Sequence, residues 1–297
     1  MKNNIIWVIV IIGLIIVGVY FFSQRSVTAP GISNNGTTTD ATASSTEPVD
    51  KTKTIIGTSV EKRNLTAYHY GTGDTELLFV GGIHGGYEWN TVLVAYQLMD
   101  YLKANPETIP TNLKITVIPV LNPDGLNKVV GTADRFTSAD VSTSEETVID
   151  GRFNANGVDL NRNFDCNWQS KGVWQKVTVD AGSKVFSEPE SQAFKNYIET
   201  NKPVAVVTWY SAVGGVFTSK CNDDILAETK TLASKYAEAS GYKANDSFDY
   251  YKTSGDMSNW LAKKEVPAIA VLLTNHQDTE WSKNLAGVKA LIKYYTK

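Results

Sequence analysis

Four short apolar runs, separated by longer amphipathic stretches, limit the fold of this chain more than any other feature. The runs span residues 77–80, 115–118, 204–207 and 268–271. Short runs without polar alternation are typical of strands buried on both faces, as in the middle of a parallel sheet. The stretches between them predict covering helices, for example over 223–240, which ends at Gly241. The sequence therefore predicts an α/β fold, with a mixed, largely parallel central sheet flanked by helices.

Composition narrows the class of protein. The chain has 297 residues, 42% of them hydrophobic, which is enough to form a full core and argues against a disordered chain or a small disulfide scaffold. A net charge of -3 gives no electrostatic reason to expect a nucleic-acid partner. The two cysteines, Cys166 and Cys221, could form one disulfide in an oxidising compartment or remain free thiols in the cytosol.

The first 25 residues predict a membrane anchor. Residues 5–22 carry no charge and are about long enough to cross a bilayer as a helix. A cleaved signal peptide is the alternative, because Val27-Thr28-Ala29 is a run of small residues, although Pro30 follows it directly. We expect an uncleaved single-pass anchor in the cell membrane, with the C-terminal domain on the extracytoplasmic side.

The rest of the chain divides into a linker and one domain. Residues 26–52 are rich in Ser, Thr, Asn, Gly, Ala and Pro and contain no aromatic residue, so a flexible linker is expected there. Residues 53–297 have the size of one large domain and show no internal repeat. We expect this domain to be a monomer.

Polar residues follow the first apolar run, where a strand of a parallel sheet would end. His84 and Glu88 stand there in a glycine-rich turn. Imidazole nitrogen and carboxylate oxygen are donors that catalytic zinc prefers, and glycines allow the backbone to bring them together. A hydrogen-bonded surface pair is the simpler alternative. After the second run, Asn122-Pro123-Asp124-Gly125 predicts a tight turn.

The segment 152–164 concentrates arginines and amides beside a short apolar stretch. Arg152, Asn161 and Arg162 are suited to binding carboxylates, because a guanidinium can donate two parallel hydrogen bonds to both carboxylate oxygens. A surface ion pair explains the residues equally well. Further on, Ser187-Glu188-Pro189-Glu190 predicts a capping box at the start of a helix.

In their order along the chain, these segments resemble the zinc carboxypeptidases of the carboxypeptidase A-like family over about residues 54–297. The segment around Asn161-Arg162 is the most specific. The resemblance rests on Gly82-Ile83-His84 with Glu88, on Asn122-Pro123-Asp124-Gly125, on residues 158–164, on Ser187-Glu188-Pro189-Glu190 and on residues 251–260. One residue more than is common in the family separates His84 from Glu88.

The resemblance implies a role for each matching residue. It implies that His84 and Glu88 bind one zinc ion and that Asn161 and Arg162 hold the terminal carboxylate of a substrate. It further implies that Arg152 polarises the scissile carbonyl and that Tyr251 is a mobile tyrosine that closes over substrate. The expected activity is that of a metallocarboxypeptidase, a hydrolase acting on peptides or on peptidoglycan stem peptides.

Two positions depart from the family pattern. Tyr210 stands where the family has a histidine as third zinc ligand, and Leu272 stands where it has a glutamate as general base. Loss of a positioned base alone is expected to lower the rate by about 10²–10⁴-fold. His276 is the best substitute ligand among the remaining candidates, although a structural or surface role is the simpler interpretation. His69 is predicted to lie in a strand, without a chemical role.

Two functions therefore remain open. The first is a membrane-anchored zinc metallocarboxypeptidase whose activity is impaired, with zinc weakly bound or absent. The second is a catalytically inactive pseudoenzyme that binds peptide C-termini through Asn161, Arg162 and Tyr251. A scaffold that retains the motifs but has no ligand is a third reading.

Overall fold

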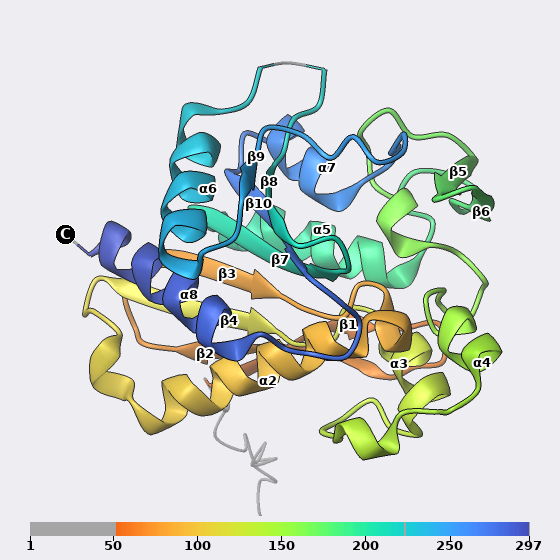
Figure 1. Ribbon diagram of the computed structural model, residues 1–297, viewed down its shortest axis with the longest axis horizontal. Helices are drawn as coiled ribbons and strands as arrows, with labels where there is room; N and C mark the ends of the chain where they lie inside the picture. The colour runs from red at the N-terminus through yellow and green to blue at the C-terminus, as the bar shows by residue number, and fades with distance from the viewer. Residues whose placement is uncertain (1–51, 223, 297) are drawn as a thin grey trace, which may run out of the picture. The chain divides into compact units, whose positions relative to one another are not determined.

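The structure is a computed structural model that describes residues 52–222 and 224–296 (Figure 1). Within these residues, one eight-stranded sheet has the order β1-β2-β4-β3-β7-β10-β8-β9. Its strands are β1 (Lys53–Thr58), β2 (Asn64–Tyr70), β3 (Thr75–Val80), β4 (Leu113–Ile118), β7 (Ala205–Ser211), β8 (Gly215–Thr218), β9 (Ala244–Asn245) and β10 (Ala268–Leu273). A separate hairpin is formed by β5 (Lys171–Trp174) and β6 (Val177–Asp180).

The four central strands, β4, β3, β7 and β10, are mutually parallel. They contain the four apolar runs of the sequence except Val204, which precedes β7 and is exposed, and they are buried because helices cover both faces of the sheet. The outer pairs β1–β2, β2–β4 and β8–β10 are antiparallel. The predicted α/β fold with a mixed, largely parallel sheet is thus confirmed.

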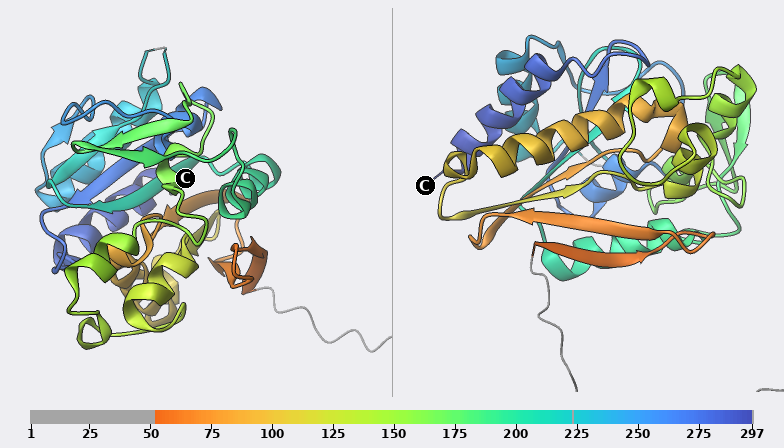
Figure 2. Two further views of the ribbon diagram at one scale, coloured as in Figure 1. Left: turned by 90° about the vertical axis from the view of Figure 1, so that its right-hand side faces the viewer. Right: turned by 90° about the horizontal axis from the view of Figure 1, so that it is seen from below.

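Helices cover both faces of the sheet (Figures 1 and 2). The longer helices are α2 (Trp89–Ala104), α5 (Pro189–Asn201), α6 (Ala227–Ser240) and α8 (Trp281–Tyr295), and the shorter ones are α3 (Pro123–Val130), α4 (Glu145–Asp150) and α7 (Met257–Lys263). Short 3-10 turns are η1 (Gly85–Glu88), η2 (Pro106–Thr108), η3 (Ser138–Asp140) and η4 (Leu160–Arg162).

Successive residues of β3 show how the two layers form. Leu77 and Phe79 pack with apolar residues of α2, α6 and α8, whereas Leu78 and Val80 pack with those of α5 and α7. Because side chains alternate along a strand, a strand between two helical layers must be apolar at every position. Each such fully buried side chain stabilises the fold by about 1.5–3 kcal/mol.

Two local predictions are wrong. Asn122 does not open an isolated tight turn but caps α3, where its side chain accepts a hydrogen bond from Gly125 N at 2.9 Å. Proline at the first helical position supports this start, because its missing N–H would have no partner there. At α5, the cap residue is Glu188 and makes no side-chain cap bond, so the predicted capping box is absent.

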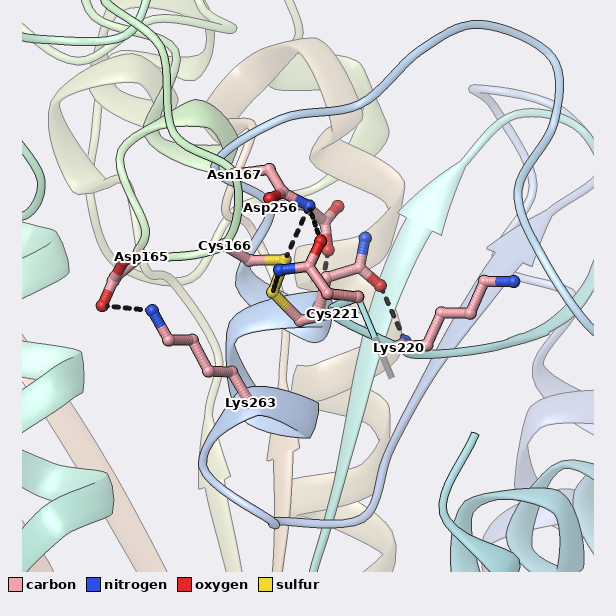
Figure 3. The surroundings of a disulfide bond; sticks show 9 residues. Asp165, Cys166, Asn167, Lys220, Cys221, Asp256 and Lys263 are labelled. Atoms are coloured by element: carbon pink, nitrogen blue, oxygen red, sulfur yellow. Dashed lines mark hydrogen bonds and ion pairs between the residues drawn. A yellow bond between two sulfur atoms is a disulfide. The ribbon is translucent and has the colours of Figure 1, made fainter. Parts of the chain in front are cut away.

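Cys166 and Cys221 form a disulfide with a Cα–Cα distance of 5.8 Å, which decides between the two states left open by the sequence (Figure 3). It joins the segment after η4 to the loop after β8. An ion pair between Lys263 Nζ and Asp165 Oδ2, 2.9 Å apart, lies beside it.

The predicted anchor over residues 1–25 and nearly all of the predicted linker lie outside the described residues. Within the described part of the chain, no helix has the length and apolar character needed to cross a membrane.

Candidate functional site

The parallel strands β3, β7 and β10 end at the same edge of the sheet, and a cavity of about 690 Å³ opens there. Ligand sites in sheets of this kind gather beyond the carboxyl ends of the strands. All six site residues predicted from the sequence line this cavity: His84, Glu88, Arg152, Asn161, Arg162 and Tyr251. The structure thus brings together residues that are up to 167 positions apart, from 84 to 251.

His84 and Glu88 are placed by the glycine-rich turn after β3. Their side chains are almost fully buried, and His84 Nδ1 lies 2.9 Å from Glu88 Oε1. Gly85 has a φ of +46°, and an added Cβ there would lie 2.6 Å from the carbonyl oxygen of Gly151. Only glycine fits this position without strain, which explains the sequence of the turn.

Asp159 connects His84 to Arg152. Its Oδ1 lies 3.5 Å from His84 Nε2, and its Oδ2 accepts hydrogen bonds from Arg152 Nε and Nη2 at 3.0 and 2.8 Å. Burial alone would raise the pKa of Asp159, but the guanidinium groups of Arg152 and Arg162 hold it well below its usual range. Asp159 is therefore a buried carboxylate that orients both His84 and Arg152. Asp159 lies within the segment 158–164, but no role was predicted for it.

Arg152 is held between this carboxylate and two aromatic rings. Its guanidinium carbon lies 4.5 Å from the ring centre of Trp174 and 5.7 Å from that of Tyr87. Its Nη1 is 3.9 Å from Glu88 Oε1. Cation–π contacts of this kind fix a guanidinium without neutralising it. Trp174, on the hairpin β5–β6, was not predicted, because a sequence does not show which hairpin lies over which arginine.

Arg162 presents a second cation to the same cavity. Its Nε and Nη2 donate to Val173 O at 3.2 and 2.8 Å, and its Nη1 donates to Asn161 O at 2.6 Å. In the described part of the chain its hydrogen bonds thus go to neutral carbonyl oxygens, which orient the guanidinium but leave its charge. One N–H remains on each terminal nitrogen, which is the pair that a carboxylate can accept.

The side chain of Asn161 is fixed from both ends. Its Oδ1 accepts hydrogen bonds from Met257 N at 3.0 Å and from Tyr210 Oη at 3.4 Å, and its Nδ2 donates to Asp256 Oδ2 at 3.3 Å. Asp256 also caps α7 through Asn259 N at 2.8 Å. Burial raises the pKa of Asp256. The amide N–H that Asp256 does not use remains available to a ligand.

Tyr251 borders the cavity in the segment before α7. Its ring centre lies 5.9 Å from the guanidinium carbon of Arg162, and its edge packs against Phe248 at a centroid distance of 4.9 Å. Burial raises the pKa of Tyr251, so its hydroxyl is a neutral donor at physiological pH.

Tyr210 and Leu272 occupy the positions that differ from the family pattern. The two residues pair directly across the parallel strands β7 and β10 and line the cavity. The ring of Tyr210 lies 5.7 Å from that of His84, centre to centre. Burial raises the pKa of Tyr210 well above its ordinary value, with nearby Asp256 adding to the effect. A neutral phenol and an alkyl chain therefore stand beside His84.

The donor set can hold only part of a zinc site. The buried atoms His84 Nδ1 and Glu88 Oε2 make no hydrogen bond in proper geometry, as expected of two donors that face a cation. A catalytic zinc, however, uses three protein ligands. Among the described residues there is no group of three or more His, Cys, Asp or Glu side chains that could hold a metal. The residues present therefore do not fit a catalytic zinc ion.

His276 does not complete this set. Its Nδ1 lies 2.8 Å from Ser211 Oγ, and its ring packs on Tyr87 at a centroid distance of 4.7 Å. Burial lowers the pKa of His276, so the ring is neutral at physiological pH. His69 lies in β2, where its two ring nitrogens contact Thr54 Oγ1 and Thr116 Oγ1 at 2.9 and 3.1 Å. It does not line the cavity.

Known proteins share this fold and this sequence pattern. Carboxypeptidase O of Bos taurus is 28% identical over 172 residues, which are 52% of this chain and 44% of that protein. Murein peptide amidase A of Vibrio campbellii is 30% identical over 154 residues, which are 48% of this chain and 58% of that protein. These matches thus span about half the length of each relative.

Solved structures agree on the fold. The murein-tripeptide amidase of Escherichia coli O157 superposes with a TM-score of 0.58 at 22% identity, covering 82% of this chain and 93% of that one. Thrombin activatable fibrinolysis inhibitor superposes with a TM-score of 0.64 at 18% identity, covering 82% and 69%.

The family comparison covers most of the domain. Residues 41–284 match the family described as zinc carboxypeptidase, Peptidase M14. This range includes all the cavity residues described above. The chain belongs to the zinc carboxypeptidase family.

Proposed function

We propose that this domain binds peptides through their free terminal carboxylate and that it has lost most or all of the family's hydrolytic activity. The observation that carries the proposal is an asymmetry within one cavity. Arg162, Asn161 and Tyr251, which the proposal assigns to the carboxylate, all line this cavity. Next to them, Tyr210 and Leu272 pair where hydrolysis would require a metal ligand and a base, and the Tyr210 hydroxyl bonds to Asn161 Oδ1 at 3.4 Å.

The binding side is supported by its charge. Arg162 is almost fully buried, and its hydrogen bonds go to Val173 O and Asn161 O, while Asp159 and Asp256 interact with its charge only through space. A buried cation is most favourable when it is hydrogen-bonded directly to an anion, and a ligand carboxylate would supply that contact. The paired N–H donors and the neighbouring Asn161 amide match the geometry of a carboxylate.

The loss of hydrolysis is supported by the chemistry of the two replacements. Leu272 can neither take a proton from water nor orient it, which by itself removes about 10²–10⁴ in rate. Tyr210 stays protonated and is a poor ligand for zinc. Both losses act on the same step, so we expect turnover far below that of a complete family member.

Weak zinc-dependent carboxypeptidase activity is the second candidate. It is favoured by His84 Nδ1 and Glu88 Oε2, buried atoms that make no well-formed hydrogen bond within the described residues, because such atoms are costly unless a cation binds them.

The proposed ligands are peptides or cell-wall stem peptides. Stem peptides are supported by the similarity to two murein peptide amidases and by the predicted extracytoplasmic placement of the domain. The anchor over residues 1–25, the linker over 26–52 and the monomeric state remain parts of this proposal. An anchored binding domain would meet such ligands at the cell surface.

The test compares peptides that differ only at the terminal carboxylate. Isothermal titration calorimetry of N-acetyl-trialanine and of a stem tripeptide, each as free acid and as amide, measures the preference directly. Two charge-assisted hydrogen bonds predict a preference of about 10- to 100-fold for the acid. Equal affinity, or no binding of either form, would overturn the proposal.

Variants locate the binding to the cavity. Arg162→Lys keeps the charge but cannot form the planar pair of hydrogen bonds, so the acid preference should fall at least tenfold. Arg135→Lys is the matched control, because Arg135 pairs with exposed Asp100 and does not line the cavity. Bound zinc together with release of alanine from the same peptide would support the second candidate, weak carboxypeptidase activity, over binding alone.

A further inference from the structure

His276 stands where the main cavity meets a second groove. It lines the cavity that holds Arg162, and it also lines an adjoining groove of about 680 Å³ beside α4. Tyr87 and Trp174 line both spaces as well. A peptide held by its carboxylate at Arg162 and continuing into the second groove would therefore pass His276.

A chain of hydrogen bonds fixes the protonation of its ring. Asn90 Nδ2 donates to two carbonyl oxygens, Asn275 O at 2.7 Å and Asp278 O at 3.0 Å, so Asn90 Oδ1 must be an acceptor. Ser211 Oγ lies 3.1 Å from this oxygen and donates its only proton to it. Ser211 Oγ can then only accept from His276 Nδ1, 2.8 Å away.

This chain of hydrogen bonds makes the other ring nitrogen of His276, Nε2, a hydrogen-bond acceptor. With Nδ1 protonated and the imidazole neutral, Nε2 carries a lone pair and is an acceptor. Burial of the ring, which lowers the pKa of His276, supports the neutral form. Among the described residues the ring makes a hydrogen bond through Nδ1 and none through Nε2, and His276 lines both the cavity and the second groove. Nε2 is thus open to a ligand.

We propose that His276 is a positioning residue whose Nε2 accepts a hydrogen bond from one of the last two backbone N–H groups of the bound peptide, those nearest to its terminal carboxylate. The inference rests on the proposed peptide binding. It identifies a second recognised feature of the ligand, an amide N–H, in addition to the carboxylate. A backbone amide fits because every peptide linkage offers a donor, whatever its side chains.

The test replaces single ligand N–H groups by ester oxygens. The probes are N-acetyl-trialanine and its two analogues in which lactic acid replaces the second or the third residue. Each ester removes one N–H donor and presents an oxygen in its place. For wild-type protein, one of the two esters should bind about 3- to 10-fold more weakly than the peptide, which is the value of one hydrogen bond.

The ratio of peptide affinity to ester affinity, measured in variants, assigns the effect to His276. In His276→Phe the peptide and both esters should bind alike, whereas His276→Gln, which can again offer an acceptor, should restore part of the discrimination. His69→Phe is the matched control and should leave both affinity and ratio unchanged, because the ring of His69 bonds to threonines of β1 and β4 and does not line the cavity. Thermal unfolding of each variant shows whether it is folded.

A spectroscopic readout tests the hydrogen-bond chain without a ligand. The ¹⁵N spectrum of His276 should show the tautomer with protonated Nδ1, and Ser211→Ala should relax that preference. Wild-type binding with equal affinity for the peptide and both esters, or a spectrum with protonated Nε2, overturns this inference and leaves carboxylate binding intact. If wild-type protein binds no free-acid peptide at all, both proposals fail.

Discussion

Leu272 lies directly opposite Tyr210, in register across the parallel strands β10 and β7, and both side chains line the cavity that holds His84 and Glu88. The two departures from the family pattern are therefore neighbours in space, although 62 positions separate them in sequence. Because a metal ligand and a base serve the same hydrolytic step, the loss of one removes the use of the other.

This pairing predicts that two substitutions together restore the missing chemistry. Tyr210→His with Leu272→Glu should supply a third zinc ligand and a proton acceptor. We expect near-stoichiometric zinc by elemental analysis and release of alanine from N-acetyl-trialanine. Tyr210→His alone should bind zinc with turnover lower by about 10²–10⁴-fold than the double variant. A folded double variant that binds peptide but does not bind zinc and does not cleave the peptide would contradict the assignment of these two positions.

Asp159 predicts a pH-dependent contribution to stability. Asp159→Asn should lower the free energy of unfolding at pH 7 by about 3–5 kcal/mol, since Arg152 would be left buried without its carboxylate. The pKa of Asp159 is lowered in the folded state, so its ionised form stabilises the fold fully above about pH 4, the ordinary aspartate value. As the pH falls from there towards the lower folded-state pKa, that contribution is lost.

Urea unfolding of wild type and variant at pH 7, 5 and 3 checks this. The difference in the free energy of unfolding between wild type and Asp159→Asn should be similar at pH 7 and pH 5 and smaller at pH 3. Asp100→Asn is the control, because Asp100 forms an exposed pair with Arg135 that contributes at most about 1 kcal/mol. A gap that stays constant down to pH 3 would show that Asp159 is not stabilised as its carboxylate.

The disulfide predicts a large dependence of stability on redox conditions. Cys166 and Cys221 are 55 residues apart, and closing a loop of that length in the unfolded chain predicts about 4 kcal/mol of stabilisation. Denaturant unfolding with and without a reducing agent measures it, with a Cys166→Ala/Cys221→Ala variant insensitive to reduction as the control. Reduction should lower the free energy of peptide binding less than the free energy of unfolding. The hydrogen bond from Asn167 Nδ2 to Asn222 Oδ1, 2.8 Å long, also joins the two segments that the disulfide connects. Identical unfolding midpoints in both conditions would count against a bridged native state.

The central sheet could be predicted because its strands are buried on both faces and must be apolar throughout. The runs at 77–80 and 268–271 fall within β3 and β10 for that reason. The prediction of a capping box at Ser187 was wrong because a short polar side chain can bond to several nearby groups. Ser187 Oγ donates to Glu188 Oε1 at 2.7 Å. Local patterns fix the type of element better than they fix its end.

The cavity residues were predictable only where a motif carried them. His84 and Arg162 belong to recognisable segments, whereas Trp174 and Ser211 act through contacts made by the folded chain. Asp159 could have been found, because an acid two residues before Asn161 and seven after Arg152 is the natural partner for a buried arginine. The link from Asn90 through Ser211 to His276 joins α2, β7 and the loop after β10, and no spacing in the sequence signals it.

Gly255 lies where the loop before α7 packs closely against the backbone of Arg162. Its φ is +64°, and an added Cβ would lie 2.1 Å from the carbonyl oxygen of Arg162. This contact cannot be relieved by a side-chain rotation, because the atom belongs to the backbone. Gly255→Ala should therefore displace Arg162 or the loop, lowering peptide affinity at least tenfold and the free energy of unfolding by more than about 2 kcal/mol.

Gly157→Ala is the matched control for backbone strain alone. Gly157 has a φ of +76°, and an added Cβ would meet no atom within 4 Å. Alanine there should cost about 1–2 kcal/mol for the left-handed conformation and leave peptide affinity unchanged. Calorimetric titration with N-acetyl-trialanine and denaturant unfolding of both variants separate the two effects. Equal losses of stability with unchanged affinity in both would show that the loop before α7 does not position Arg162, and that the carboxylate site is held by its own turn.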